Sequence, residues 1–322
     1  MIMSEEELLP YRVGGLLYFP STRQDMFEKI EAHAIKDVTS IAFCLEDAIR
    51  DSALDVAEQT LKTTLCKFRK SASVDCPLLF VRVRTPEHLR HVHLFLGEDE
   101  GAVTGYILPK FDLTNAQEYL DFFREVNRPG ESPLFFMPIL ESEQIADLET
   151  RRRALYRLKE MLDSVKEYVL NIRVGGNDFC NLFGARRSVR QNVYQIGVVR
   201  DILTDILNVF SRDYVVSGPV WEYYDNRRDT AWLDGLKKEL ELDKANGFIG
   251  KTAIHPSQLP VIFDSMRVTE EDYEDAKRLL DWKPELVGVE RSSNGNRMNE
   301  QKCHGKWAER ILCLASVYGV KK

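Results

Sequence analysis

The chain has 322 residues, 44% of them hydrophobic and 30% charged, which is enough to bury the core of a large globular protein. Its formal net charge of −7 argues against nucleic acid as the main partner, because phosphate binding needs a basic surface. No run approaches the roughly 18 consecutive apolar residues of a membrane span, so we expect no membrane partner.

The six cysteines are scattered and form no Cys-x-x-Cys pair, which excludes a zinc ribbon and a thioredoxin motif. The first residues are acidic and lack the apolar run of a secretory leader. We therefore expect reduced thiols and a cytoplasmic location.

Short runs rich in β-branched and aromatic residues alternate with longer helical patterns. Eight runs are predicted as strands, at residues 15–20, 40–46, 78–84, 105–110, 134–141, 168–175, 214–217 and 250–255. Strands that alternate with helices form a parallel sheet, and eight is the number at which such a sheet closes. We predict an α/β fold of the (β/α)8 TIM-barrel class. An open doubly wound sheet is the alternative, although the turn after its first strand normally carries a glycine fingerprint that residues 20–23 lack.

The predicted helices fill the intervals between these strands. Their signals include Pro86 at a first turn, Thr114 as an N-cap and a charged helix around residues 151–153. Beyond residue 266 the pattern changes, with one helix expected at 269–282 and an amphipathic helix at 301–318. We therefore divide the chain into a barrel, residues 1–266, and a C-terminal helical arm, residues 267–322.

Nearly every predicted strand ends in a charged or polar residue. In a TIM barrel the active site forms at the carboxyl ends of the strands, so these side chains would converge on one rim. The candidates are Arg23, Glu46, Asp47, Arg82, Lys110, Glu141, Asn177, Asp178 and His255. The alternative is that the ends of strands are exposed to solvent and carry polar residues for that reason alone.

Glu141 and Asp178 close the fifth and sixth predicted strands, which are neighbours in a barrel of sequential order. Two hard carboxylates, completed by water and substrate oxygens, suit Mg²⁺ or Mn²⁺. The glycines at 175 and 176 favour a metal site, because they let a backbone approach a ligand closely. The alternative is that each acid simply caps the helix that follows it.

Arg82 lies inside an apolar strand, so its guanidinium is expected to point into the barrel mouth. There it would bind a substrate carboxylate or stabilise a developing oxyanion. A buried salt bridge to Glu46 is the alternative, and both arrangements can hold together. Of Glu46 and Asp47, one is expected to face the site, unless both are solvated acids before a helix.

The histidines give weaker signals. His255 ends a strand before a proline-started helix, where it would either orient the site or support the turn. His88, His91 and His93 suggest a metal site, but a solvated helix is the default interpretation.

At these strand ends the chain resembles the citrate lyase β-subunit family of the HpcH–HpaI aldolase superfamily, in its TIM-barrel C–C bond lyase branch. The motifs that carry the resemblance lie at residues 17–20, 45–48, 81–83, 108–110, 141, 175–178 and 253–258. Singly they are weak, but their order at successive strand ends is fairly specific.

The resemblance implies retro-aldol or retro-Claisen cleavage of a small hydroxy acid or its CoA ester, giving a 2-oxo acid or acyl product. Glu141 and Asp178 would hold Mg²⁺ or Mn²⁺. Arg82 would stabilise the enolate-like oxygen, with Glu46 and Asp47 as further catalytic residues. Substrate binding would involve Arg23, Lys110, Asn177 and His255. A homo-oligomer, a trimer or hexamer, is also implied.

Three positions depart from the family pattern. Asn299 stands where thioester-cleaving relatives supply an aspartate, and an amide cannot act as a general base. Cys44 replaces a frequent acid and Asn177 a common glutamate. A second interpretation therefore stays open, in which a catalytically weakened barrel serves as a ligand-binding or complex-forming protein.

Overall fold

The computed structural model describes residues 3–71, 76–281 and 289–321. Contacts divide the chain into two compact units. One spans Val13–Ile262, and the other combines Met1–Arg12 with Phe263–Lys322. The boundary between residues 266 and 267 that the sequence suggested stays a prediction.

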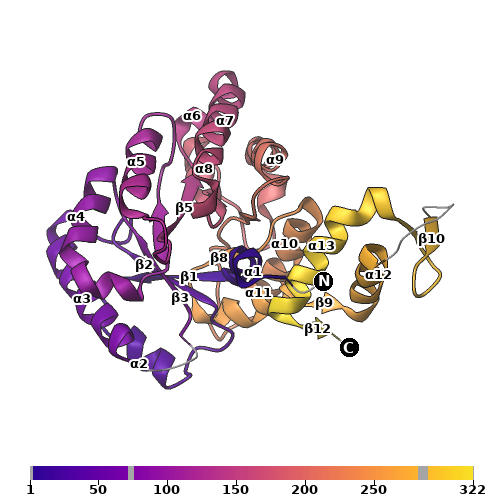
Figure 1. The fold of residues 1–322 in the computed structure, drawn as a ribbon, viewed down its shortest axis with the longest axis horizontal. Helices are drawn as coiled ribbons and strands as arrows, with labels where there is room; N and C mark the ends of the chain where they lie inside the picture. Colours follow the sequence, from indigo (N-terminus) through magenta and orange to yellow (C-terminus); the bar gives the residue numbers. More distant parts are fainter. Residues whose placement is uncertain (1–2, 72–75, 282–288, 322) are drawn as a thin grey trace. The chain divides into compact units, whose positions relative to one another are not determined.

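The larger unit is the predicted barrel, with eight parallel strands in the order β7-β6-β5-β4-β3-β2-β1-β8 (Figure 1). The strands are β1 (Gly15–Pro20), β2 (Ser40–Cys44), β3 (Leu78–Arg82), β4 (Gly105–Leu108), β5 (Phe135–Leu140), β6 (Ile172–Val174), β7 (Val216–Ser217) and β8 (Lys251–Ala253). A parallel bridge joins Gly218, just after β7, to Lys251 at the start of β8. This bridge closes the sheet, and the structure confirms the (β/α)8 prediction.

Several strands end before the polar residues that the sequence assigned to them. The β2 ladder stops at Cys44, so Glu46 lies in the following loop, and β4 stops at Leu108, two residues before Lys110. These side chains are therefore carried by loops at the carboxyl ends of the strands, which is the edge where a TIM barrel builds its active site.

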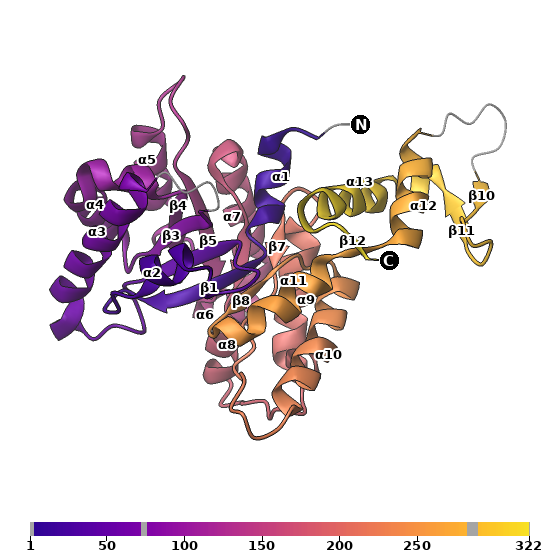
Figure 2. The same cartoon turned by 90° about the horizontal axis from the view of Figure 1, so that it is seen from below.

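The helices lie outside the strands, as both ribbon views show (Figure 1, Figure 2). They are α2 (Met26–Glu31), α3 (Leu54–Lys70), α4 (Pro86–Leu96), α5 (Ala116–Val126), α6 (Glu143–Ala146), α7 (Leu148–Asp163), α8 (Gly176–Leu182), α9 (Gly197–Phe210), α10 (Ala231–Asn246) and α11 (Leu259–Met266). Pro86 begins α4 as predicted. The prediction that Thr114 is the N-cap of the next helix is wrong, because α5 begins after Asn115. The Thr114 hydroxyl instead donates to Asp112 Oδ1, 2.5 Å away.

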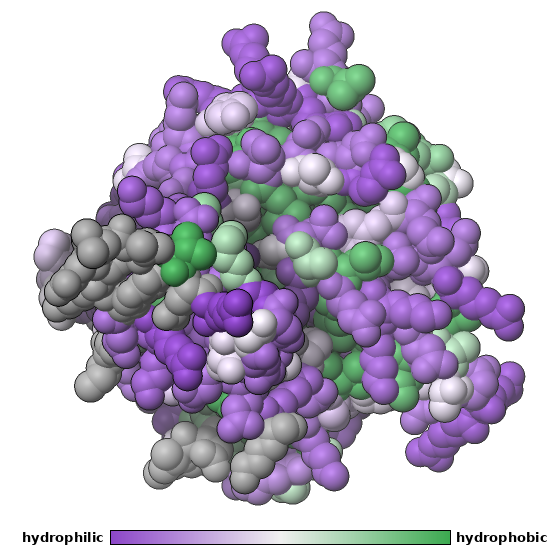
Figure 3. Space-filling model, turned by 90° about the vertical axis from the view of Figure 1, so that its right-hand side faces the viewer, coloured by the Kyte–Doolittle hydropathy of each residue, from purple (hydrophilic) through white to green (hydrophobic). Residues whose placement is uncertain are grey.

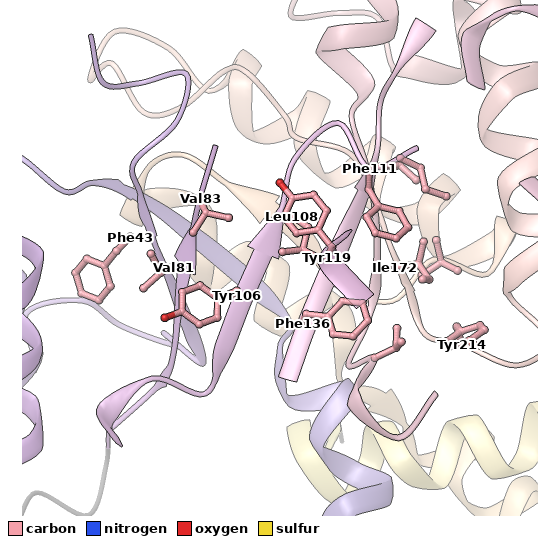
Figure 4. Packing of buried hydrophobic residues seen from close by; sticks show 14 of the residues in the cluster. Phe43, Val81, Val83, Tyr106, Leu108, Phe111, Tyr119, Phe136, Ile172 and Tyr214 are labelled. Carbon is pink, nitrogen blue, oxygen red and sulfur yellow. The ribbon is translucent and has the colours of Figure 1, made fainter. Parts of the chain in front are cut away.

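The main core lies between strands and helices, and Figure 4 shows part of it, including Phe43, Val81 and Leu108. Successive side chains of a strand point to opposite faces. The alternate strand residues, such as Phe80 and Ile107, are also fully buried and fill the barrel interior. The strands are buried on both faces, which explains their nearly continuous apolar sequence.

The smaller unit contains α1 (Glu5–Arg12), α12 (Glu270–Asp281), α13 (Gln301–Tyr318) and two short strand pairs, β9 (Val268–Thr269) with β12 (Val320–Lys321) and β10 (Val289–Arg291) with β11 (Met298–Glu300). The predicted helices near 269–282 and 301–318 are α12 and α13, while Trp282 lies outside the described residues. The Tyr318 hydroxyl donates to the Tyr11 carbonyl at 2.6 Å. That bond ties the end of α13 to α1.

None of the described helices has the length and apolar character that a membrane span requires. Hydrophilic side chains cover most of the face in Figure 3, and hydrophobic ones appear in the recesses between them. The six cysteines are free thiols, in agreement with the sequence-based expectation.

Candidate active site

The site centres on Arg82, the last residue of β3, whose guanidinium is buried and turned toward three acids. Its Nη2 lies 2.9 Å from Glu46 Oε2, 3.2 Å from Asp47 Oδ2 and 3.4 Å from Glu141 Oε1. The salt bridge to Glu46 and the position in the barrel mouth, proposed as alternatives, both hold. Burial lowers the pKa of Arg82, but Tyr18, Glu141 and Glu46 outweigh it and keep the pKa above its ordinary value, so the group carries a permanent positive charge.

Lys110 completes the charged cluster from the loop after β4. Its Nζ lies 2.5 Å from Glu46 Oε1 and 3.3 Å from Asp47 Oδ1, and its backbone N–H donates to Glu141 Oε1 at 3.0 Å. The residue adopts a left-handed backbone with φ of +48°, which costs energy for any side chain but glycine. Asn115 donates to the Lys110 carbonyl at 2.9 Å and holds this turn.

Glu141 and Asp178 meet across Gly175. The carboxylates are hydrogen-bonding neighbours. A methyl carbon placed on Gly175 would lie 2.5 Å from Glu141 Oε2 and 3.0 Å from Asp178 Oδ2. Only glycine leaves room for both oxygens. Glu141 also does not cap a helix, because its carboxylate accepts from Lys110 and Arg82 instead.

Burial raises the pKa of Glu141 to about 8, with Asp178 adding to the rise and Arg82 opposing it. The buried Glu141 carboxylate and the half-buried Asp178 carboxylate repel one another, and a cation between them would stabilise the pair. In the part of the chain described, no group of three or more His, Cys, Asp or Glu could hold a metal. A pair of acids therefore fits Mg²⁺, which usually keeps several water or substrate ligands, better than an all-protein cage.

The pKa values of Glu46 and Asp47 are shifted in opposite directions. Burial and the neighbouring Asp47 raise the pKa of Glu46. Burial acts in the same direction on Asp47, but hydrogen bonding with Glu46 and the charges of Arg82 and Lys110 hold its pKa below the ordinary value. The pair can thus share one proton between unequal positions.

Two further residues in the barrel interior escaped sequence analysis. Tyr18 on β1 lies beneath Arg82, whose guanidinium carbon is 5.6 Å from the ring centroid. Arg173 on β6 is 1% exposed and donates to Thr252 Oγ1 at 2.6 Å. For Arg173 the available signal was a charged residue within an apolar strand, the same signal that identified Arg82.

Three predicted substrate-binding residues make no contact with the Arg82 cluster among the described interactions. Arg23 pairs with Asp25 at 2.9 Å. His255 Nδ1 lies 2.8 Å from the Ser257 hydroxyl, and its ring stacks on Tyr224. His255 thus supports the turn before α11. Asn177 occupies the first turn of α8, half-buried, and the substrate-binding roles of these residues stay predictions.

The solvated-helix interpretation of the α4 histidines holds only for His91, whose side chain is 57% exposed, because the side chains of His88 and His93 are 10% and 30% exposed. His88 and His91 both contact the buried Glu58 carboxylate, at 2.8 and 3.0 Å, and His93 lies 2.8 Å from Glu100. Residues three apart on a helix lie on one side, which lets one acid reach both rings.

The fold and this acid-and-arginine site define a TIM-barrel lyase. Residues 7–320 match the family described as C-C bond lyase of the TIM-barrel fold, and the chain belongs to that family. It is therefore a carbon–carbon bond lyase, as the resemblance implied. No curated protein matches it significantly.

Solved structures share the fold at low sequence identity. CitE of Mycobacterium tuberculosis with magnesium, acetoacetate and coenzyme A has 21% identity and a TM-score of 0.59, covering 95% of this chain and 99% of that one. The citrate lyase beta subunit of M. tuberculosis with oxaloacetate and magnesium has 21% identity and a TM-score of 0.52, covering 79% and 98%. RipC from Yersinia pestis has 17% identity and a TM-score of 0.53, covering 80% and 95%.

Proposed function

We propose that this lyase is Mg²⁺-dependent and cleaves a small hydroxy acid to release a 2-oxo acid such as pyruvate. The observation that carries the proposal is the convergence of Glu141 and Asp178 oxygens on one point at Gly175, beside the Arg82 guanidinium. A metal between the two acids would offset the burial, and the added repulsion by Asp178, that raise the pKa of Glu141.

The donor set fits a hard divalent ion. Both groups are carboxylates, and no described cluster supplies the third protein ligand that a closed site would need. When bound, Mg²⁺ would supply Lewis acidity toward the carboxylate and keto oxygens of the product acid. The solved CitE structures that share this fold hold magnesium with oxaloacetate or pyruvate, which supports the choice of ion and product.

The protein's own residues would hold and polarise the reacting acid. Arg82 is fixed by three carboxylates, so its remaining N–H groups are oriented before substrate binds. There it would stabilise the negative oxygen that develops when the carbon–carbon bond breaks. Lys110, half exposed, would bind a substrate carboxylate at the rim. Glu46 and Asp47 would fix both cations in place.

We propose a free acid as substrate rather than a CoA ester. Asn299 stands at the position of the aspartate in thioester-cleaving relatives, and its side chain is only 3% exposed within the smaller unit. An amide cannot remove or deliver a proton at neutral pH. CitE of M. tuberculosis does bind coenzyme A, so a CoA ester is the competing outcome of the test.

The test is exchange of pyruvate methyl protons with deuterated water, followed by NMR, with and without Mg²⁺. We expect exchange only with the metal, and a loss of at least about 100-fold in Glu141→Gln. Glu143→Gln, on the adjacent α6, is the matched control and should exchange at the wild-type rate. Wild-type exchange in Glu141→Gln would overturn the metal assignment. Absence of exchange in the wild type, with pyruvate alone and with added CoA, would favour the non-catalytic barrel.

A further inference from the structure

Tyr18 holds an unusual position for a tyrosine on a barrel strand. It points inward from β1, with the Arg82 guanidinium over its ring at 5.6 Å, and Arg173 is its second positively charged neighbour. The side chain is half-buried.

Arg173 has no carboxylate partner. Its Nη2 donates to Thr252 Oγ1, and the buried Nε and Nη1 have no hydrogen-bond partner among the described residues. A buried charge without a counterion is costly, and burial accordingly lowers the pKa of Arg173. Such a group is most useful where negative charge develops transiently nearby, and the nearest acidic group is the Tyr18 hydroxyl.

The arrangement fixes the direction of the Tyr18 proton. A guanidinium can only donate, so the Tyr18 oxygen can interact with the N–H groups of Arg173 only as an acceptor. Its own O–H must then point elsewhere. Burial holds the pKa of Tyr18 above its ordinary value although both arginines oppose the rise. The resting group is therefore a neutral phenol that carries a proton.

The lyase reaction needs a proton at the enolate carbon, and few described groups beside the site can deliver it. Lys110 and Glu46 are bound to one another at 2.5 Å, and Glu46 also pairs with Arg82. Asp47 is held in its ionised form, because hydrogen bonding with Glu46 and the charges of Arg82 and Lys110 keep its pKa below the ordinary value although burial opposes this. Glu141 and Asp178 are the proposed metal ligands. Tyr18 is the remaining candidate that adjoins Arg82 from the barrel interior.

We propose that Tyr18 is the catalytic acid that protonates the enolate carbon, with Arg173 as the residue that positions it. This inference rests on the proposed function. In the cleavage of a 4-hydroxy-2-oxo acid, the hydroxyl-bearing carbon becomes a carbonyl and the electron pair of the broken C–C bond passes into the enolate of pyruvate. The Tyr18 O–H bond then breaks and a C–H bond forms at carbon. The phenolate regains, through solvent, the proton that the substrate hydroxyl lost on becoming a carbonyl.

The two guanidinium groups give this step its driving force. A phenolate at Tyr18 would be held by Arg173 at the oxygen and by Arg82 above the ring. Both charges are fixed before the reaction, so they stabilise the phenolate without reorganisation. In reverse, the same phenolate takes a proton from the methyl group of pyruvate, which is the exchange that NMR detects.

The experiment compares the wild type with Tyr18→Phe in two measurements. In Mg²⁺ and deuterated water, exchange at the pyruvate methyl is expected to fall at least about 100-fold in Tyr18→Phe. Binding of oxalate with Mg²⁺, measured by calorimetry, is expected to stay within about threefold, because the phenol acts on the enolate carbon rather than on the bound acid. Tyr214→Phe is the control, since its hydroxyl bonds to Asp163 instead, and it should match the wild type in both.

Three results would overturn the inference. Tyr18→Phe could exchange within threefold of wild type, or it could lose oxalate binding in parallel with exchange, which would mark a structural role. Loss of exchange in Glu46→Gln with full exchange in Tyr18→Phe would assign the acid to Glu46. Absence of exchange in the wild type is a different failure, because it removes the proposed function first and Tyr18 with it.

Arg173 is tested through the conservative change. Arg173→Lys is expected to retain part of the exchange that Arg173→Met loses, with oxalate and Mg²⁺ bound equally by both, because only a positive charge can stabilise the phenolate. Equal exchange in the two variants would contradict the positioning role.

Discussion

Gly175 illustrates how a single residue sets the geometry of the acidic pair. A side chain there would lie 2.3 Å from Glu141 Cβ, which cannot move as freely as the end of a side chain. We expect Gly175→Ala to lower the free energy of unfolding by about 1–3 kcal/mol. Mg²⁺ affinity should fall by about tenfold or more.

Calorimetric titration of Mg²⁺ and urea denaturation check both effects. Gly197→Ala is the control, because no atom lies within 4 Å of the added carbon. Wild-type Mg²⁺ affinity in Gly175→Ala would mean that the two acids do not hold the ion together.

The sequence predicts much of the candidate site at this scale. Polar residues at the ends of strands can be recognised in any sequence that predicts a barrel. Three of them, Arg82, Glu46 and Glu141, do meet in the structure. Tyr18 could not be predicted in this way, because an aromatic residue in an apolar strand is equally typical of a core position. Arg23 follows β1 as expected but pairs with Asp25, and its substrate-binding role stays a prediction.

Among the elements, α10 is joined to β8 by a fully buried ion network. Lys251 Nζ lies 2.9 Å from Glu239 Oε1 and 2.7 Å from Asp243 Oδ2, and Arg187 lies 3.1 Å from Glu239. We expect Lys251→Met to cost about 3–5 kcal/mol, because it leaves neighbouring carboxylates buried without their shared cation. Urea denaturation measures the loss. The exposed Glu241→Gln on the same helix should change little, and a loss below about 1 kcal/mol in Lys251→Met would contradict the account.

The contact between α4 and the turn that follows it should depend on pH. Hydrogen bonding to Glu100 raises the pKa of His93 above its ordinary value, although burial opposes this. A group with a raised folded-state pKa contributes its full stability below the unfolded-state pKa, and this contribution is lost as pH rises through the folded-state value. The stability difference between wild type and His93→Gln should therefore shrink from pH 5.5 to pH 8.5. A constant difference would exclude the ion pair.

The helices and strands were largely predictable from the sequence, but the residues at which the strands begin and end were not. Continuous apolar runs identify the strands because both faces of a barrel strand are buried. The apolar pattern predicts strands that are longer than those in the structure. For β6 it predicts a strand from residue 168, whereas the strand forms only at Ile172–Val174. Val169 and Leu170 before it are buried, and Val169 makes an isolated parallel bridge to Phe136, so an apolar run does not show where the regular strand begins.

At the scale of the whole molecule, metal and product should stabilise the fold through binding alone. A ligand that binds only the native state at 100 times its Kd adds about 2.7 kcal/mol to the free energy of unfolding. We expect Mg²⁺ with oxalate to raise the Tm of the wild type and EDTA to reverse the rise. Asp178→Asn should show no rise, and an equal rise there would place the ion elsewhere. The trimer or hexamer that the resemblance implies stays a prediction.

The most direct test of the account is a crystal of the protein grown with Mn²⁺ and oxalate, with anomalous diffraction recorded for manganese. We predict one strong peak roughly 2.2 Å from a carboxylate oxygen of Glu141 and one of Asp178, with oxalate completing the shell beside Arg82. A peak bound to other residues, or an oxalate held at this site with no manganese between the two acids, would contradict the central claim.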